Sequence, residues 1–314
     1  SLTIPTNAEF RIDQPHVMTT DIIVGEGGKL SHTANGSSET RRMDLTLQGD
    51  LTVQNGGGVD VSGRGYSASY GPGTHSANYC GASHGGLGVG GLSCYGSLVA
   101  PTNIGSGGRD GGRGGGAIRL AVSGVINNDG GIRANASAAT QRAGAGGSIF
   151  ITCGELLGSG PIQANSSTNV TGGYPGGGGR IALAVTNAGA DFSAYTPDMI
   201  TVYGGTDSTG DSGGVGTLYL RWPGQGLYDG ALFVDDVNEN TVGTEIGPLV
   251  TDTQVSDVFI RQFGRLALTN QTLTVSGIWS NGASFTGLAD SMVAFAGAPE
   301  STSTLYGSTL FNGL

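Results

Sequence analysis

Lysine is nearly absent from this chain, and charged residues of any kind are scarce. The 314 residues contain one lysine, Lys29, beside thirteen arginines and twenty-four acidic residues, so the charged fraction is 12% and the formal net charge is −10. Binding to nucleic-acid phosphates depends on clustered Lys and Arg side chains. The charge balance therefore argues against a nucleic-acid partner.

Long hydrophobic runs and helical patterns are also missing. No stretch approaches the roughly 18 consecutive apolar residues that a membrane-spanning helix needs. No segment keeps the apolar spacing of three and four residues that is typical of an amphipathic helix. We expect an all-β chain without a membrane span. No signal peptide opens the sequence, and the uncapped apolar phrase STLFNGL at its end predicts a piece of a longer protein, or a subunit that stacks on another.

Cysteine is rare, with three residues and no C-x-x-C pair. Without that spacing, a metal site built from these cysteines is not expected. Cys80 and Cys94 lie 14 residues apart in one long irregular segment, where a disulfide would fasten a loop that has little core of its own. We therefore predict a disulfide between Cys80 and Cys94. Cys153 falls in the strand-like phrase SIFITCG and is expected to be a buried free thiol.

Glycine, by contrast, is abundant, and its 61 residues recur in a regular phrase. A glycine-rich start followed by a short apolar run occurs four times, as GGGAIRLAV, GGSIFIT, GGGRIALAV and GVGTLYLRW. The anchor residues of these phrases, 31, 32 and 37 positions apart, are Ile118, Ile149, Ile181 and Leu218. A unit that repeats at this spacing and cannot bury its own apolar face must stack on its neighbours.

The repeat predicts a parallel β-helix, or β-solenoid, with Gly-rich loops and right-handed winding. Residues 1–44 are expected to form an N-terminal cap or first rungs, residues 45–236 the Gly-rich solenoid, and residues 237–314 C-terminal strand-rich rungs. Residues 64–106 break the rhythm and are interpreted as a loop insertion. Paired glycines before each strand suit tight corners, and the longer Gly runs are expected to form polyproline-II-like stacks in backbone contact.

The order of these phrases resembles a known class of segment. LTVQNGGGVDVSGRGY, GASHGG, GGGAIRL, GGGGRIAL and GGVGTLYL resemble the Gly-rich β-solenoid segments of very large secreted or surface proteins of bacteria. The later phrases GIWSNGASFTG, MVAFAG and LYGSTLFNGL resemble the strand repeats that commonly follow in bacterial exoproteins and adhesin-like proteins. The resemblance covers nearly the whole chain and implies a secreted protein at the bacterial cell surface, while leaving its activity open.

One departure from that resemblance concerns two asparagines. In such proteins the phrase after the first strand often ends in Ala-Asn-Gly, whereas here Asn135 is followed by Ala136 and Asn165 by Ser166. The two asparagines lie 30 residues apart in matching phrases. If they stack as a ladder along a corner, they serve structure.

The insertion at 64–106 is where a ligand site is expected, because long irregular loops in compact domains often carry function. Tyrosine rings offer platforms for sugar stacking, and histidine can bind metal or move protons. The candidate glycan-contacting residues are Tyr66, Tyr70, Tyr79, Tyr95 and His84. Packing of the loop onto the flank of the solenoid is the alternative, and the favoured one.

Calcium is the single cofactor that the sequence suggests. DSTGDSGG contributes Asp207 and Asp211, and VDDVNEN contributes Asp235 and Asp236, so hard oxygen ligands sit on turns, as calcium prefers. Neither phrase matches an EF-hand loop or the repeated nonapeptide of calcium-binding β-helices. Turn formation by Asp and Asn alone is the competing interpretation.

Three functions remain open at this level. The first is an extracellular structural or adhesive module, forming a stalk or filament, whose partners are copies of itself or cell-surface and matrix polysaccharide. The second is a carbohydrate-active β-helix, either a polysaccharide lyase or a glycoside hydrolase. The third is a glycan-binding module without turnover. Arg119, Arg133 and Arg180 lie on the repeated strands and are expected to be exposed structural arginines rather than catalytic ones.

Overall fold

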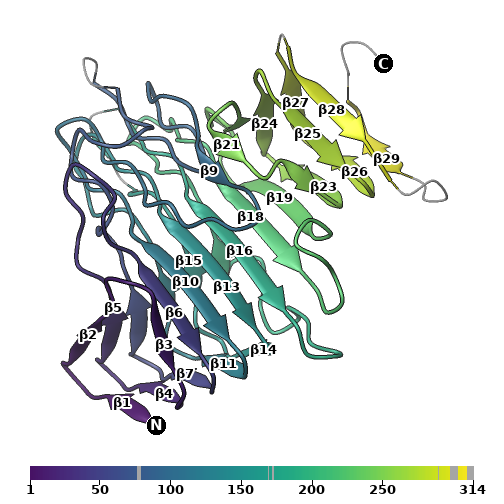
Figure 1. Cartoon of the computed structure of the whole chain (residues 1–314). Helices are drawn as coiled ribbons and strands as arrows, with labels where there is room; N and C mark the ends of the chain where they lie inside the picture. The colour runs from purple at the N-terminus through teal and green to yellow at the C-terminus, as the bar shows by residue number, and fades with distance from the viewer. Residues whose placement is uncertain (76–78, 169, 172, 289, 298–302, 310–314) are drawn as a thin grey trace.

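The computed structural model describes residues 1–75, 79–168, 170–171, 173–288, 290–297 and 303–309. This part of the chain is all-β: it forms strands β1 to β29 and contains no helix. It accordingly offers no helical segment that could cross a membrane. Every pair of hydrogen-bonded strands in it runs parallel, with one exception between β18 and β19. Parallel pairing therefore dominates the architecture (Figure 1).

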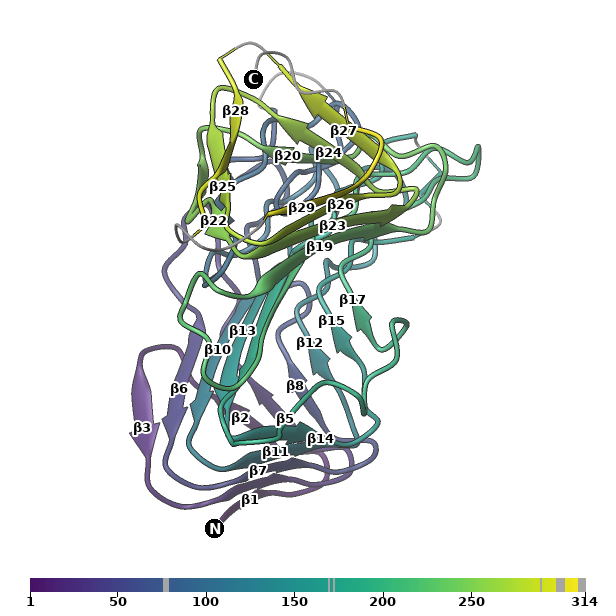
Figure 2. The same cartoon turned by 90° about the vertical axis from the view of Figure 1, so that its right-hand side faces the viewer.

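Strands β1 to β18, apart from β9, form what we call the N-terminal unit, in which the chain passes repeatedly through three sheets in one order. The five-stranded sheet contains β1 (Leu2–Ile4), β4 (Ile22–Val24), β7 (Leu51–Val53), β11 (Val125–Asn128) and β14 (Glu155–Leu157). The six-stranded sheet contains β2 (Glu9–Arg11), β5 (Lys29–Ser31), β8 (Gly58–Asp60), β12 (Ile132–Arg133), β15 (Ile162–Gln163) and β17 (Ile200–Thr201). Figure 2 shows these sheets as two sides of a triangle.

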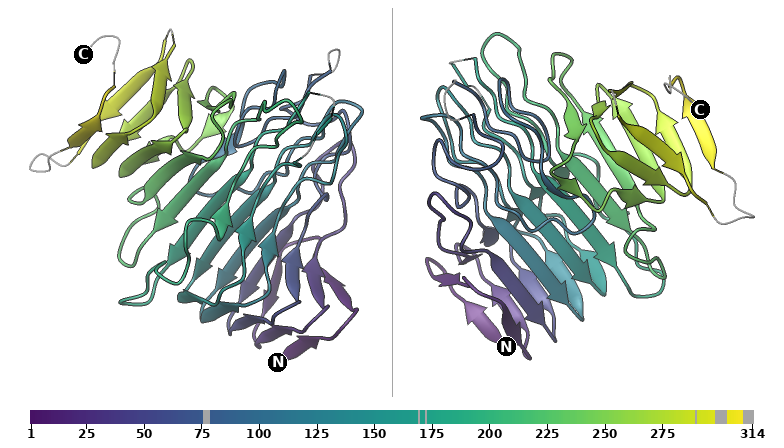
Figure 3. Two further views of the ribbon diagram at one scale, coloured as in Figure 1. Left: turned by 180° about the vertical axis from the view of Figure 1, so that it is seen from behind. Right: turned by 45° about the horizontal axis from the view of Figure 1, so that its top comes forward.

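The third side is a ten-stranded sheet that extends beyond the N-terminal unit. Its first six strands are β3 (His16–Met18), β6 (Met43–Leu47), β10 (Ala117–Val122), β13 (Ser148–Cys153), β16 (Arg180–Val185) and β18 (Thr217–Arg221). Its last four are β19 (Ala231–Asp236), β23 (Asp257–Gln262), β26 (Ile278–Asn281) and β29 (Thr304–Gly307). Figure 1 and the right-hand view of Figure 3 show this sheet from the front, running from the first strands of the chain to the last.

The four anchor residues of the sequence repeat lie side by side across this sheet. Ile118 pairs with Ile149, Ile149 with Ile181, and Ile181 with Leu218. The three isoleucines have no measurable exposure. Burying such a side chain contributes about 1.5–3 kcal/mol relative to leaving it in water. The repeat therefore marks an internal ladder, and each pass of the chain covers the apolar face of the pass before it.

Strands β19 to β29 form what we call the C-terminal unit, built in the same manner around two three-stranded sheets. These sheets contain β20 (Thr244–Ile246), β24 (Arg265–Leu268) and β27 (Ser284–Gly287), and β22 (Gln254–Val255), β25 (Thr272–Val275) and β28 (Met292–Phe295). Its own internal ladder on the ten-stranded sheet is Leu232, Val258 and Trp279, which pair in that order and are fully buried.

The two units use opposite faces of the shared sheet. In the antiparallel pair, Leu218 lies opposite Phe233, and Tyr219 lies opposite Leu232. Directly opposed residues share a face, so Phe233 continues the face that is interior in the N-terminal unit, while Leu232 belongs to the other face. Figure 2 shows the strands of the two units on opposite sides of the sheet. The interior therefore changes sides where the strand direction reverses.

Gly-rich segments close the N-terminal unit along the edge where β8, β12, β15 and β17 lead back to the ten-stranded sheet. Consecutive segments are joined by backbone bonds: the amides of Gly115, Gly146 and Gly178 donate to the carbonyls of Ala145, Gly177 and Gly214, at 3.0, 3.1 and 2.9 Å. The same segments also bond sideways, since the amides of Gly147, Gly179 and Gly216 donate to Ala134, Ala164 and Val202. Bonding on several sides is expected of polyproline-II-like segments, whose three residues per turn point in three directions.

Backbones in these segments approach too closely to admit side chains. A Cβ on Gly178 would collide with the carbonyl oxygen of Val202, and one on Gly146 with that of Ala164. The expected contact of backbone with backbone is therefore confirmed. It is the close approach, rather than a positive φ, that requires glycine at these two positions.

The asparagine ladder is present as well. The amide of Asn165 donates to Oδ1 of Asn135 at 2.8 Å, and the amide of Tyr203 donates to Oδ1 of Asn165 at 2.7 Å. Each asparagine thus satisfies a backbone donor of the next pass at the corner that follows the six-stranded sheet. Both residues serve structure, as their spacing suggested.

Residues 64–106 bind the two units together. Strand β9 (Gly96–Ser97) pairs in parallel with β21 (Val250–Thr251) of the C-terminal unit. The amide of Leu87 donates to the carbonyl of Gly243 at 3.0 Å, and that of Cys94 donates to the Glu245 carboxylate at 3.2 Å. The insertion therefore lies against the flank and bridges the reversal of the sheet.

The close approach of the Gly-rich segments predicts a specific sensitivity. Gly178→Ala should lower the free energy of unfolding by about 2–3 kcal/mol, because its methyl group has only backbone to displace. Gly36→Ala is the matched control: no atom lies within 4 Å of its added Cβ, so its effect should stay within about 0.5 kcal/mol. Urea unfolding followed by circular dichroism measures both, and equal stabilities for the two variants would contradict the account.

Candidate functional site: a groove where the two units meet

The five residues proposed for glycan contact do not form one surface. Tyr95 and His84 are buried, at 4% and 0% exposure, and their rings lie 4.6 Å apart between centroids. Tyr70 and Tyr79 are exposed, and Tyr66 is half-buried. Packing of the loop, the favoured alternative, therefore describes His84 and Tyr95. The outer tyrosines are engaged in part, since the Arg142 guanidinium sits 3.7 Å from the Tyr79 ring centroid.

The buried residues His84 and Tyr95 lie beside a buried charge, the guanidinium of Arg180. Arg180 has no measurable exposure, so the expectation of an exposed arginine is wrong for this residue. Its Nε donates to the Tyr95 carbonyl and one Nη to the Thr217 hydroxyl, both at 2.8 Å. Burial lowers the pKa of Arg180 to about 10. The loop thus buries Arg180 on the strand face opposite to Ile181, and its Tyr95 carbonyl stabilises the guanidinium.

Histidine 84 is held neutral beside that guanidinium. Its Nδ1 lies 2.7 Å from the Gly146 carbonyl, which places the proton on Nδ1. Burial, and after it the neighbouring charge of Arg180, lower the pKa of His84 to about 3. An imidazole in this state is a hydrogen-bond donor to the Gly-rich segments, and it is poorly suited to acid–base catalysis near neutral pH.

The predicted disulfide is absent. Cys80 and Cys94 are separate, buried free thiols, as is Cys153, for which a buried thiol was expected. The Cys80 sulfur accepts a hydrogen bond from the His75 amide at 3.4 Å, while Cys94 belongs to the hydrophobic core and its amide donates to Glu245 of the C-terminal unit. Burial raises the pKa of Cys94 to about 12. The loop is fastened by backbone pairing with its neighbours, so it needs no covalent link.

Three of the four carboxylates suggested for calcium, those of Asp207, Asp235 and Asp236, accept other hydrogen bonds, and Asp211 takes part through its backbone amide. Oδ1 of Asp207 accepts bonds from the amides of Thr209 and Asp211, at 2.8 and 2.9 Å, which is turn formation. Asp236 is buried and accepts bonds from the amides of Val215 and Asn238. Across the described ranges, no three or more His, Cys, Asp or Glu side chains are grouped so that they could hold a metal ion.

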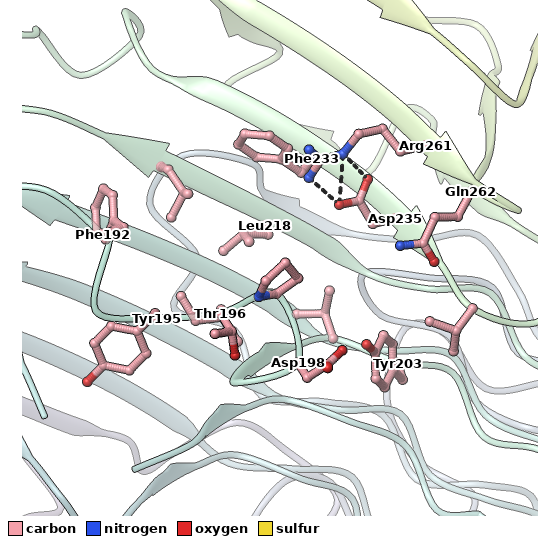
Figure 4. Close-up of a pocket in the computed structure, with 15 residues that line it drawn as sticks. Phe192, Tyr195, Thr196, Asp198, Tyr203, Leu218, Phe233, Asp235, Arg261 and Gln262 are labelled. Carbon is pink, nitrogen blue, oxygen red and sulfur yellow. Dashed lines mark hydrogen bonds and ion pairs between the residues drawn. The ribbon is translucent and has the colours of Figure 1, made fainter. Parts of the chain in front are cut away.

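Asp235 instead belongs to a groove of about 280 Å³ at the junction of the two units. Its floor is apolar and consists of the last interior residues of the N-terminal unit, Leu218 and Leu220 on β18 with Ile200 and Val202 on the six-stranded side. Figure 4 shows Leu218 beneath the ring of Phe233, which rises from β19. The groove is thus the end of the N-terminal unit's hydrophobic interior, which no further strand of that unit covers.

A loop rather than a strand forms one wall. After β16 the chain omits the five-stranded sheet and instead runs through 186–199, which buries Phe192 and Tyr195 at 8% exposure each. Phe192 packs edge-on against Trp222, with centroids 5.5 Å apart. Thr196, Pro197 and Asp198 of this loop line the groove and face solvent.

The opposite wall carries an ion pair. Arg261 Nε donates to both carboxylate oxygens of Asp235, at 2.9 and 3.1 Å, and its guanidinium lies 4.7 Å from the Phe233 ring centroid. The bond to Asp235 raises the pKa of Arg261. Burial raises the pKa of Tyr203, and the carboxylates of Asp198 and Asp235 raise it further. The groove therefore combines aromatic rings with a net negative charge.

Sequence reasoning missed this groove, although part of the signal was present. Alternation in ALFVDD places Phe233 and Asp235 on one face, and alternation in VFIRQ places Phe259 and Arg261 on one face. What the alternation does not reveal is which face lies inside.

Comparison with protein-family models, with curated proteins and with solved structures finds no match to this chain.

Neutral burial of His84 predicts a stability that depends on pH. The folded state holds its pKa near 3 while the unfolded chain titrates near 6.5, so unfolding takes up about one proton between these values and stability is lost as the pH falls through that window. Unfolding free energies from urea titrations between pH 7 and pH 4 should show a shallower slope for His84→Gln than for the unaltered protein. Parallel slopes would contradict the assignment.

The absence of a disulfide predicts that reductant has no effect on stability. Dithiothreitol should leave the thermal midpoint unchanged, because no S–S bond exists for it to break. Thiol titration in denaturant, without reductant, should detect all three cysteines. Detection of only one thiol under those conditions would show that a disulfide is present and would contradict the assignment of three free thiols.

Proposed function

We propose that this chain is a β-solenoid that serves as an extracellular structural or adhesive module of a bacterial surface protein. The observation that carries the proposal is the ten-stranded sheet, which joins β3 to β29 and ties both units into one extended body. In this body each pass of the chain contacts mainly the passes before and after it, and the strands of the shared sheet lie side by side in chain order. Such an extended arrangement suits a stalk or spacer.

The strand order supports a solenoid. From β10 to β16 the chain visits the ten-, five- and six-stranded sheets in strict rotation, each time pairing in parallel with the previous pass. Parallel strands joined through other strands of this kind favour right-handed winding, which we include in the proposal. The C-terminal unit follows the same logic with its own two flanking sheets.

The use of the titratable side chains supports a structural role over catalysis. His84 and Arg180 are committed to carbonyls of the Gly-rich segments and the loop, and Asp236 to backbone amides. Asp235 is paired with Arg261. Side chains committed to such partners stabilise the fold, whereas catalysis of a lyase or hydrolase type requires an acid and a base that are free to exchange protons with a substrate.

A test on polysaccharide separates the structural proposal from its enzymatic alternative. The protein is incubated with particles of acidic and of neutral polysaccharides, and both retention and product release are measured. We expect retention on at least one material, with no unsaturated uronate absorbance and no new reducing ends. Release of either product would replace the proposal with a polysaccharide lyase or a glycoside hydrolase.

Self-association is the second arm of the proposal, since copies of the same chain are proposed partners. Sedimentation velocity over a wide concentration range, with electron microscopy of the concentrated samples, should show concentration-dependent assemblies. A protein that stays monomeric throughout and is retained on no polysaccharide would contradict a structural or adhesive role.

A further inference from the structure

We propose that the groove between the two units binds one neutral sugar ring of a polysaccharide chain. The inference deepens the adhesive function proposed above and rests on it, because it names the surface through which the scaffold would hold a glycan. It rests on the aromatic lining, the planar polar groups at the rim, the sign of the charge and the size of the groove.

The groove exists because the reversal of the sheet leaves an interior uncovered. Leu218 is the fourth member of a ladder whose other members are fully buried, yet it is only half-buried itself. Its neighbour on the next strand is Phe233, which is half-buried too. Apolar surface that the fold creates but does not cover is available to a ligand.

The apolar lining suits the C–H face of a pyranose. Phe233 and Tyr203 both line the groove and lie on opposite sides of it in Figure 4, with Leu218 between them. Phe233 is held in place by stacking on Phe259, at 5.1 Å between centroids and 14° between planes. Fixed aromatic rings supply a large apolar contact at little entropic cost.

Polar groups surround that lining at the level of the sugar hydroxyls. Asp198 on one wall and Asp235 with Gln262 on the other carry planar carboxylate or amide groups, each able to form two hydrogen bonds. The bonds from Arg261 fix the carboxylate of Asp235 in place. An apolar ring bearing equatorial hydroxyls matches such a site, whereas a wholly apolar ligand would leave these groups unsatisfied.

The sign of the charge selects among sugars. Two aspartates and one arginine line the groove, and the whole chain carries a formal charge of −10. A uronate or sulfated residue would bring a further negative charge beside Asp198 and Asp235 and would be repelled.

The size of the groove sets the length of the bound segment. Its volume of about 280 Å³ lies at the low end of ligand pockets and corresponds to one sugar ring. The exposed loop 196–198 leaves room for the rest of the polysaccharide chain to continue into solvent.

The test is titration calorimetry with defined oligosaccharides. Cellohexaose, mannohexaose, xylohexaose and laminarihexaose are the neutral probes, and hexagalacturonate is the acidic one. We expect saturable binding of at least one neutral probe and none of hexagalacturonate. Phe233→Ala should weaken binding about tenfold or more, as loss of a stacking ring does.

Two further variants make the result specific. Tyr306→Ala is the matched control, because Tyr306 lies in the same row of the ten-stranded sheet, is exposed, and is outside the groove, so it should leave affinity unchanged. Asp198→Asn keeps the hydrogen-bonding shape and removes the charge, so a neutral sugar should lose no more than about threefold, while a cationic ligand would lose far more.

Several outcomes would overturn the proposal. These are the absence of binding by every neutral probe, a preference for hexagalacturonate, or affinity that Phe233→Ala does not change. Thermal unfolding of each variant establishes that the fold is intact. A folded, self-associating protein that binds no sugar would remove the groove's role while leaving the structural function standing, so the two failures can be told apart.

Discussion

Backbone hydrogen bonding between successive passes of the chain is the interaction on which this structure depends. In the sheets it takes the form of parallel pairing, and in the Gly-rich segments it continues without any strand. The amide of Gly146, for example, donates to Gly177 just as β13 pairs with β16 a few residues later. Because each pass presents the same donors and acceptors at the same spacing, one pass positions the next. Side chains then add burial to an arrangement that the backbone already defines.

This backbone bonding explains at which positions side chains fit and which types of side chain occur there. Corners in which backbones touch admit only glycine, and Gly178 against Val202 is an example. At the corner after the six-stranded sheet a short polar side chain acts as the partner of a backbone amide, as Asn165 does for the amide of Tyr203. The loop at 64–106 covers Arg180 and brings the Tyr95 carbonyl to its guanidinium, so a charge on the outer face of the strand is buried with a hydrogen-bond partner.

The sequence predicted what is periodic and missed what depends on contacts between distant segments. Spacing between Ile118, Ile149 and Ile181 was enough to place them side by side, because parallel passes of equal length bring equivalent residues together. The prediction of a Cys80–Cys94 disulfide was wrong because it considered only residues within the insertion. Pairing of β9 with β21 holds the insertion to the C-terminal unit without a covalent link. Burial of Arg180 was missed for the same reason, since its carbonyl partner at Tyr95 lies 85 residues away.

The groove was beyond prediction because it follows from a change of face and not from a motif. A strand such as β19 alternates between two sets of side chains, and either set could point inward. The face that Phe233 takes depends on the register in which β19 pairs with β18, because a shift of one residue would exchange the two sets of side chains. The alternation within ALFVDD does not set that register. In the observed antiparallel register Phe233 lies opposite Leu218, so it continues the ladder of Leu218 on the face that points away from the core of its own unit. The apolar end of the N-terminal unit's interior is therefore left uncovered at this junction and is bordered by the polar residues Asp235 and Gln262.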